Sequence, residues 1–304
     1  MPAKVSPIAP ASRFLDLASL ATLRGMRFAP RGRIEGHYAG RHRSHQRGGA
    51  SEFADYREYS AGEDLRRLDW KVLARTGRPY VRLYQDETDL SCTLLLDASS
   101  SMTFGGRAAT TKLDYVQWLS TAISQLIRDQ RDRVGLGVVA DGLTDFLPPT
   151  GLPSQIAQLQ AAIEALQCKP QSDLASGLRE LFGRLTRRGV LMVISDFLVD
   201  DLDAVFSALR LFRHNRWEIS LLHIVHPEEE RLPEGLAYRF EGLENDGIVA
   251  CSPAEVKVAY ERAFEAHASA VRGGALATGC EYWRISTAMP YLQTLGRFLI
   301  DRNG

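Results

Sequence analysis

From about residue 91 onward, apolar strand-like runs alternate with helical segments, and this alternation constrains the fold more than any other feature of the chain. Repeated strand–helix units predict an α/β fold with a mainly parallel central sheet, helices on both faces and right-handed crossovers. We expect strands at residues 92–97, 133–140, 143–147, 190–195, 217–224 and 281–286. We expect helices at residues 110–130, 153–166, 174–186, 201–213, 253–272 and 289–301, and a polar hairpin over 238–250 with Asp246-Gly247 as its turn.

The first 90 residues lack this alternation, so we predict two parts. Residues 1–90 form a basic, arginine-rich extension, and residues 91–304 form the α/β domain with a C-terminal helical and strand extension. Within the extension, helical spacing covers 14–26, residues 28–50 have no clear period, and 81–84 are typical of a strand.

The charge is unevenly distributed, although the whole chain is formally neutral. In residues 1–50, nine basic side chains face only Asp16 and Glu35, which leaves seven positive charges (nine minus two). This face could meet an acidic partner, a membrane surface or RNA, or it could be a solvated arm. Because the overall charge is zero, we expect no nucleic-acid partner.

Four cysteines without a C-x-x-C pair fit a reducing cytoplasm. No run approaches the roughly 18 apolar residues of a membrane span, and the N-terminus lacks the apolar core of a signal peptide. We therefore expect a cytoplasmic protein without a transmembrane segment.

Asp97-Ala98-Ser99-Ser100-Ser101 directly follows the first apolar strand run. A carboxylate and two hydroxyls at alternate positions thus leave the C-terminal end of a buried strand, which is the edge where open α/β sheets bind ligands. Oxygen ligands with little net charge suit Mg²⁺, which keeps several waters. The alternative is a Ser-rich turn that caps the next helix.

Two further positions would complete a metal site at this edge. Asp196 ends the apolar strand run 190–195, and Ser172 precedes the helix that begins near Leu174. The alternative for Ser172 is an ordinary helix N-cap. Mg²⁺ and Mn²⁺ both prefer such oxygen ligands, so either ion fits.

Residues 91–225 resemble a von Willebrand factor A domain. The Asp-x-Ser-x-Ser turn, a later loop hydroxyl and a later strand-end Asp resemble the metal-ion-dependent adhesion site (MIDAS) of that family. The resemblance implies that Asp97, Ser99 and Ser101 hold the ion, with Ser172 in the usual Thr position and Asp196 in the third loop. It also implies that part of the shell is water and that a partner's carboxylate takes an open position.

Residues upstream narrow the resemblance to the bacterial "domain of unknown function 58" (DUF58) family. The segments that carry it are Gly36-His37-Tyr38-Ala39-Gly40, Arg47-Gly48-Gly49, Glu52-Phe53, Arg57-Glu58-Tyr59, Gly62-Glu63-Asp64, Arg66, Leu68-Asp69-Trp70 and Ala74-Arg75. Such proteins are often encoded beside a MoxR-type AAA+ ATPase, and the pair is thought to act as a chaperone system in protein maturation or stress response. Many relatives carry N-terminal membrane helices, which this sequence lacks.

The arginine-rich segment has two readings. Arg57, Arg66 and Arg75 lie near several carboxylates, and arginine forks pair well with carboxylates. With Trp70 as an anchor, these residues either clasp the segment onto the α/β domain or form a partner-binding surface.

The leading hypothesis is a non-enzymatic, metal-dependent protein-binding module that works with the ATPase and takes a client carboxylate at the ion. The alternative is a Mg²⁺-dependent phosphohydrolase using Asp97. That chemistry normally needs a second acid two residues on, where Ser99 stands. The sequence has no Gly-x-x-x-x-Gly-Lys-Ser/Thr loop, so we expect no ATPase activity of its own. His223 and His226 bracket the end of a strand and could face the site, but a core or surface role is the simpler expectation.

Overall fold

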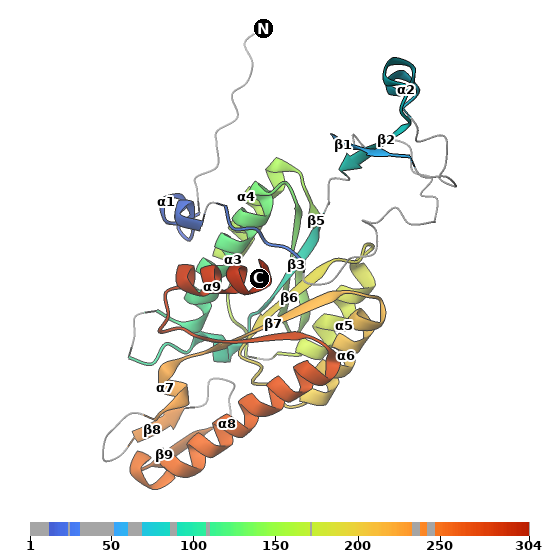
Figure 1. The fold of residues 1–304 in the computed structure, drawn as a ribbon. Coiled ribbons are helices and arrows are strands. Elements are labelled where there is room, and N and C mark those ends of the chain that lie inside the picture. Colours follow the sequence, from blue (N-terminus) through green and yellow to red (C-terminus); the bar gives the residue numbers. More distant parts are fainter. Residues whose placement is uncertain are drawn as a thin grey trace. The chain divides into compact units, whose positions relative to one another are not determined.

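The computed structural model describes residues 12–23, 25–30, 52–59, 69–85, 90–107, 110–170, 172–232, 238–241 and 247–303. It divides the chain into two compact units (Figure 1). One unit comprises Met1–Gly32 and Leu90–Gly304, and the other comprises Arg33–Asp89. The described residues of the N-terminal segment, 12–23 and 25–30, therefore belong to the larger unit.

The larger unit is built on a six-stranded sheet of order β10-β7-β6-β3-β4-β5. Its strands are β3 (Ser91–Asp97), β4 (Arg133–Ala140), β5 (Gly142–Thr150), β6 (Val190–Ser195), β7 (Glu218–Val225) and β10 (Glu281–Ser286). Every pair from β10 to β4 is parallel. Each residue of β3 and β6 is buried, as expected for strands covered on both faces. The predicted α/β class with a mainly parallel sheet is confirmed.

The edge strand β5 differs from the expected short strand at 143–147. It is antiparallel to β4, and Ala140 pairs with Gly142 across a one-residue connection. So short a link cannot return a chain in parallel. The strand also runs through Pro148 and Pro149. Two prolines are tolerated there because an edge strand needs ladder hydrogen bonds on one side only.

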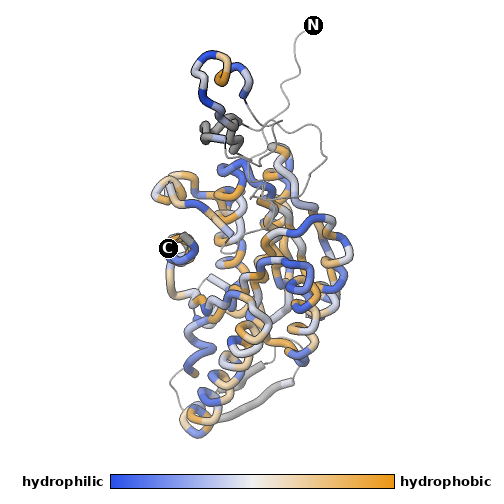
Figure 2. The backbone as a smooth tube through the Cα atoms, turned by 45° about the vertical axis from the view of Figure 1, so that its right-hand side comes forward, coloured by the Kyte–Doolittle hydropathy of each residue, from blue (hydrophilic) through white to orange (hydrophobic). Residues whose placement is uncertain are grey.

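Helices cover both faces of the sheet (Figure 1). Contacts between elements place α3 (Lys112–Asp129), α4 (Pro153–Glu164) and α9 (Tyr291–Asn303) together on one face. The other face carries α5 (Leu174–Arg184), α6 (Leu202–His214) and α8 (Pro253–Thr278), whose apolar residues form one core with the strands. In Figure 2 these helices alternate between hydrophilic and hydrophobic colours along their length, as expected for helices with one buried side.

Residues 12–30 do not form the continuous helix expected over 14–26. The structure has α1 (Leu17–Leu20) and a 3₁₀ turn η1 (Ala21–Leu23), with Asp16 as the N-cap of α1. Tertiary contacts, and not a long helix, fix the position of this segment. The Phe14 ring packs edge-on against Trp118 of α3, and the Phe28 ring stacks on Phe298 of α9.

The C-terminal extension adds a small antiparallel pair, β8 (Tyr238–Glu241) and β9 (Ile248–Cys251). Glu241 pairs with Ile248, so the hairpin expected over 238–250 is present, whereas Asp246 of its expected Asp246-Gly247 turn lies outside the described residues. Helix α8 runs six residues beyond the expected end and stops at Gly279, whose φ is +74°. No helix among the described residues has the length and apolar character needed to cross a membrane.

The smaller unit pairs β1 (Glu52–Glu58) with β2 (Tyr80–Gln85) in antiparallel fashion. Between them, α2 (Trp70–Thr76) is capped by Asp69, whose side chain accepts hydrogen bonds from the N–H groups of Lys71 and Val72. The helix ends at Gly77 in the left-handed region. The strand expected at 81–84 is thus β2.

Candidate metal site

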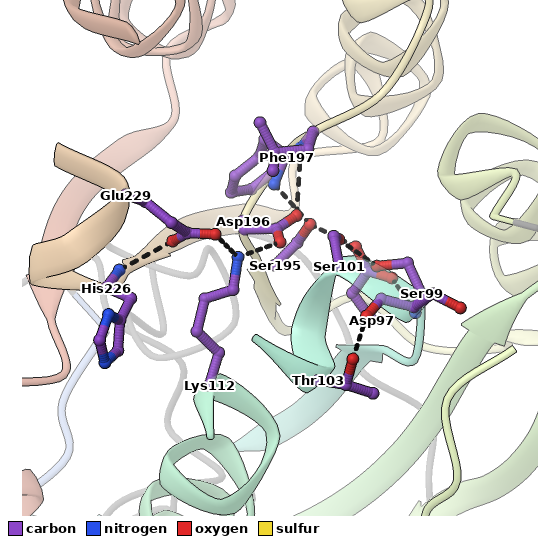
Figure 3. Close-up of polar contacts among 12 residues, drawn as sticks. Asp97, Ser99, Ser101, Thr103, Lys112, Ser195, Asp196, Phe197, His226 and Glu229 are labelled. Carbon is purple, nitrogen blue, oxygen red and sulfur yellow. Dashed lines mark hydrogen bonds and ion pairs between the residues drawn. The ribbon is translucent and has the colours of Figure 1, made fainter. Parts of the chain in front are cut away.

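The first loop of the candidate site begins where β3 ends. Asp97 is 2% exposed, and its Oδ1 accepts a hydrogen bond of 2.9 Å from the N–H of Ser99. The chain then enters the 3₁₀ turn η3 (Ser100–Thr103). The Ser99 and Ser101 hydroxyls lie 2.9 Å apart and are both buried. The alternating carboxylate and hydroxyls therefore point to one side of the turn (Figure 3).

The second loop reaches Asp97 from the start of α5. Its backbone pairs with the first loop, because the N–H of Lys169 donates to Ala98 O at 2.8 Å. The N-cap of α5 is Asp173, which accepts from Ser176 N, so the capping alternative for Ser172 is wrong. The Ser172 hydroxyl is directed instead toward Asp97 and lies 3.5 Å from Oδ1.

The third loop follows β6 and supplies Asp196 together with a residue that the sequence analysis missed. The hydroxyl of Ser195, the last residue of β6, donates to Asp97 Oδ2 at 2.5 Å and accepts from Phe197 N at 2.8 Å. Asp196 is 2% exposed, and its Oδ1 accepts from Leu198 N. A serine inside an apolar strand run, directly before a strand-end acid, was the available signal for Ser195.

Lys112, the first residue of α3, is the second residue beside the candidate site that the sequence did not reveal. Its side chain is fully buried, and its Nζ lies 2.6 Å from Asp196 Oδ2 and 2.5 Å from Glu229 Oε1. Figure 3 shows the ammonium between the two carboxylates. Burial opposes the charged form, but these two carboxylates outweigh it and raise the pKa of Lys112.

The pKa values of the two aspartates of the site are shifted in opposite directions. Burial favours the neutral acid at both positions. At Asp196 the neighbouring Lys112 overcomes this effect and holds the pKa below its ordinary value. At Asp97, burial and the negative charge of Asp196 raise the pKa. Among the described residues, no cation forms an ion pair with Asp97. The site thus holds one compensated carboxylate and one that lacks a counter-charge.

A short helix after β7 closes the site on the side of Lys112. In α7 (Pro227–Glu230), three consecutive glutamates contact three different elements. Glu228 accepts from Arg107 N in the loop after η3, Glu229 from Lys112 of α3, and Glu230 from Arg284 of β10. This one turn therefore connects the first loop, α3 and the sheet edge.

The two histidines that bracket the end of β7 have different surroundings, and neither is exposed. His226 caps α7, and its ring packs edge-on against Phe104. His223 is 2% exposed, and burial lowers its pKa to about 4. Its Nδ1 lies 2.8 Å from the Tyr282 hydroxyl, and its ring packs edge-on against the Phe197 ring. The core role is thus the one that the structure supports for His223.

The donor set tests whether a divalent ion fits. The Ser172 and Ser195 side chains that hydrogen-bond to Asp97 present hydroxyls, and among the described residues no cation pairs with this buried carboxylate; both features favour a hard cation. Among the described residues, no three His, Cys, Asp or Glu side chains form a metal cluster. An ion here would thus need hydroxyl and water ligands in addition to carboxylate. Mg²⁺ and Mn²⁺ both accept such a set of oxygen ligands, so the residues fit either ion.

The predicted partner-binding residues all belong to the smaller unit. Trp70 and Arg75 both lie on α2 and are exposed, Trp70 by 60%. Arg57 lies in β1, of which the structure describes the backbone only. Arg66 lies outside the described residues. Neither the clasp nor the partner surface is tested by this geometry.

A family model described as "Protein of unknown function DUF58" matches residues 55–270, which is most of the chain. The chain belongs to the DUF58 family. This DUF58 protein is 28% identical over 291 residues to an uncharacterized protein of Mycobacterium tuberculosis (strain ATCC 25618 / H37Rv), covering 93% of this chain and 89% of the relative. An uncharacterized protein of Mycobacterium bovis (strain ATCC BAA-935 / AF2122/97) matches with the same values.

Solved structures similar to this DUF58 chain share little sequence with it. The conserved hypothetical protein BatB of Bacteroides thetaiotaomicron is 14% identical, with a TM-score of 0.47 over 70% of this chain and 98% of its own. The VWA domain of SpRpn10 is also 14% identical, with a TM-score of 0.44 over 68% of this chain and 93% of its own. These likenesses concern the arrangement of helices and strands.

Proposed function

We propose that this chain is a protein-binding module that holds Mg²⁺ or Mn²⁺ at Asp97 and uses the ion to capture a carboxylate of its partner. The observation that supports the proposal is the buried Asp97 carboxylate, which forms no ion pair among the described residues. The Ser172 hydroxyl lies 3.5 Å from it, and the adjoining turn carries the paired hydroxyls of Ser99 and Ser101. Neutral hydroxyl ligands would leave the ion electrophilic, so that it attracts a further anionic oxygen.

The described residues would divide the work at such a site. Asp97, Ser99 and Ser101 would hold the ion, and Ser172 would approach from the second loop. Ser195 orients Asp97 through its hydroxyl. Asp196, already paired with Lys112, would act through water. The ion, when bound, supplies the Lewis acidity that a partner carboxylate needs.

We propose a MoxR-type AAA+ ATPase as the working partner, in protein maturation or stress response in the cytoplasm. Membership of the DUF58 family supports this choice, and a client protein would provide the carboxylate at the ion. The exposed face of α2, with Trp70 and Arg75, would be available to the ATPase. A client held at the ion and by the ATPase at once would join the two proteins, so capture of the ATPase would depend on the ion.

A pull-down of the cognate ATPase, with and without EDTA, tests the metal-dependent part. We expect EDTA or Asp97→Ala to reduce capture at least tenfold, because either change removes the ion. Ser100→Ala is the matched control, since Ser100 lies in the same turn between Ser99 and Ser101 without belonging to the donor set. Equal capture by the EDTA-treated protein, Asp97→Ala and the untreated protein would refute the role of the ion.

The same preparations test the phosphohydrolase alternative. Both oxygens of Asp97 already accept hydrogen bonds, and the side chain is 2% exposed, which favours a ligand over a nucleophile. Mg²⁺-dependent turnover of a generic phosphate ester that disappears in Asp97→Asn would replace the binding function with a catalytic one.

A further inference from the structure

The ammonium of Lys112 is held in place from two sides. Asp196 lies 2.6 Å from Nζ on the side of the metal site, and Glu229 lies 2.5 Å away on the side of α7. Glu229 is itself fixed, because its Oε2 accepts from His226 N at 2.9 Å and its backbone O accepts from the Tyr260 hydroxyl at 2.8 Å. Lys112 is therefore a permanent cation beside the site.

This cation changes the charge that an incoming ion meets. Asp97 and Asp196 would together offer two negative charges, but Lys112 neutralises the one on Asp196. Charges in a buried site interact strongly, because little water screens them. A divalent ion at Asp97 is thus attracted by one carboxylate and repelled by the nearby ammonium.

We propose that Lys112, anchored by Glu229, competes with the divalent ion for Asp196 and sets a low intrinsic ion affinity. The inference rests on the proposed function and adds its regulation. The ion then needs the partner's carboxylate to reach full occupancy, so ion and partner strengthen each other's binding. Such coupling is reciprocal, because each ligand must raise the affinity of the other by the same factor.

The test removes the buried pair without changing the net charge. In Lys112→Met combined with Glu229→Gln, the methionine fills the path of the lysine stem. The glutamine keeps an acceptor for His226 N, and Asp196 is released. The control is Arg284→Met with Glu230→Gln, which removes an ion pair of 2.8 Å from the same turn of α7 without touching Asp196. The probe is Mn²⁺ alone, titrated while the EPR signal of the free ion is recorded.

We expect the Lys112/Glu229 double variant to bind Mn²⁺ about tenfold more tightly than the unmodified protein, a change of about 1.4 kcal/mol. We expect the Arg284/Glu230 control to bind as the unmodified protein does. Glu229→Gln alone has the opposite expectation. With the charge of Glu229 removed, the Lys112 ammonium pairs with Asp196 alone, so Mn²⁺ binds more weakly. This variant provides the test if the double variant fails to fold.

Failure of this inference is separable from failure of the proposed function. Mn²⁺ binding that Asp97→Ala abolishes, but that the double variant leaves unchanged or weaker, overturns only the role of Lys112. An absence of saturable binding in both the unmodified protein and the double variant overturns the metal site itself. Binding that appears only in the double variant supports the competition by Lys112.

Discussion

At the third loop, Phe197 has a backbone φ of +53° although its side chain is fully buried. The left-handed region costs a residue with a Cβ roughly 1 kcal/mol, and such backbone is common at functional sites. The conformation lets Phe197 N donate to Ser195 Oγ while the ring packs against His223. It therefore orients the hydroxyl that binds Asp97, at the expense of local strain.

At position 197 we expect the glycine variant to be more stable than the alanine variant, which is the reverse of the usual order. Both variants lose the buried ring, which costs about 3–5 kcal/mol. We expect Phe197→Gly to be about 1 kcal/mol more stable than Phe197→Ala, because only glycine relieves the positive φ. Urea unfolding measures both. Phe206 in α6 is the control, since alanine should be the more stable replacement within a helix. An alanine variant at 197 that equals or exceeds the glycine variant would contradict the strain.

At the scale of elements, neighbouring glycines in α8 have opposite surroundings. A Cβ at Gly274 would meet the Phe206 ring of α6 at 2.1 Å, whereas a Cβ at Gly273 would meet nothing within 4 Å. Gly274 thus permits α8 to approach α6 closely. This contact places α8 where Tyr260 reaches Glu229, the residue that holds Lys112 beside the site.

Alanine substitutions at these positions should therefore change stability in opposite directions. We expect Gly273→Ala to stabilise the protein by about 0.5–1 kcal/mol, because alanine lowers the backbone entropy cost of a helix. We expect Gly274→Ala to destabilise it by about 1–3 kcal/mol, because the methyl group overpacks the interface. Thermal unfolding of the two variants, which are each other's control, decides this. A stabilised Gly274→Ala variant would show that α8 does not pack closely there.

At the scale of the whole molecule, Arg302 joins the C-terminal helix to distant parts of the larger unit. Its side chain is fully buried and forms ion pairs with Glu218 of β7 and Glu281 of β10. Its Nε donates to Ala29 O at 2.9 Å, and its guanidinium lies 4.6 Å from the centre of the Phe28 ring. One side chain thus secures α9, two strands and the N-terminal segment.

Removal of Arg302 should weaken the whole unit. We expect Arg302→Met to lower the free energy of unfolding by about 3–5 kcal/mol, because it takes a buried cation from two carboxylates. Arg297→Met on the same helix is the control, since Arg297 is exposed and should change stability by no more than about 0.5 kcal/mol. The measurement is denaturant unfolding. Equal losses for the two variants would refute the joining role of Arg302.

Much of the fold could be predicted because its signals are local. Apolar runs in β3, β6 and β7 identified buried strands, and repeated strand–helix units led to the parallel sheet. The same reasoning placed Asp97 and Asp196 at strand ends, so they were expected at one sheet edge. The antiparallel β5 and the short α1 escaped prediction, because a one-residue link and tertiary contacts outweighed the local pattern.

The amino-acid sequence by itself determined that a carboxylate and hydroxyls leave the end of a buried strand, since strand length and turn residues are encoded within a few positions. Only the tertiary structure decided which charges surround them. Lys112 meets Asp196 across 84 positions of the chain and Glu229 across 117. No local pattern records such contacts, because they form when packing excludes water and leaves each buried charge to find a partner. Among the described residues, that packing left Asp196 with a buried cation and Asp97 without one.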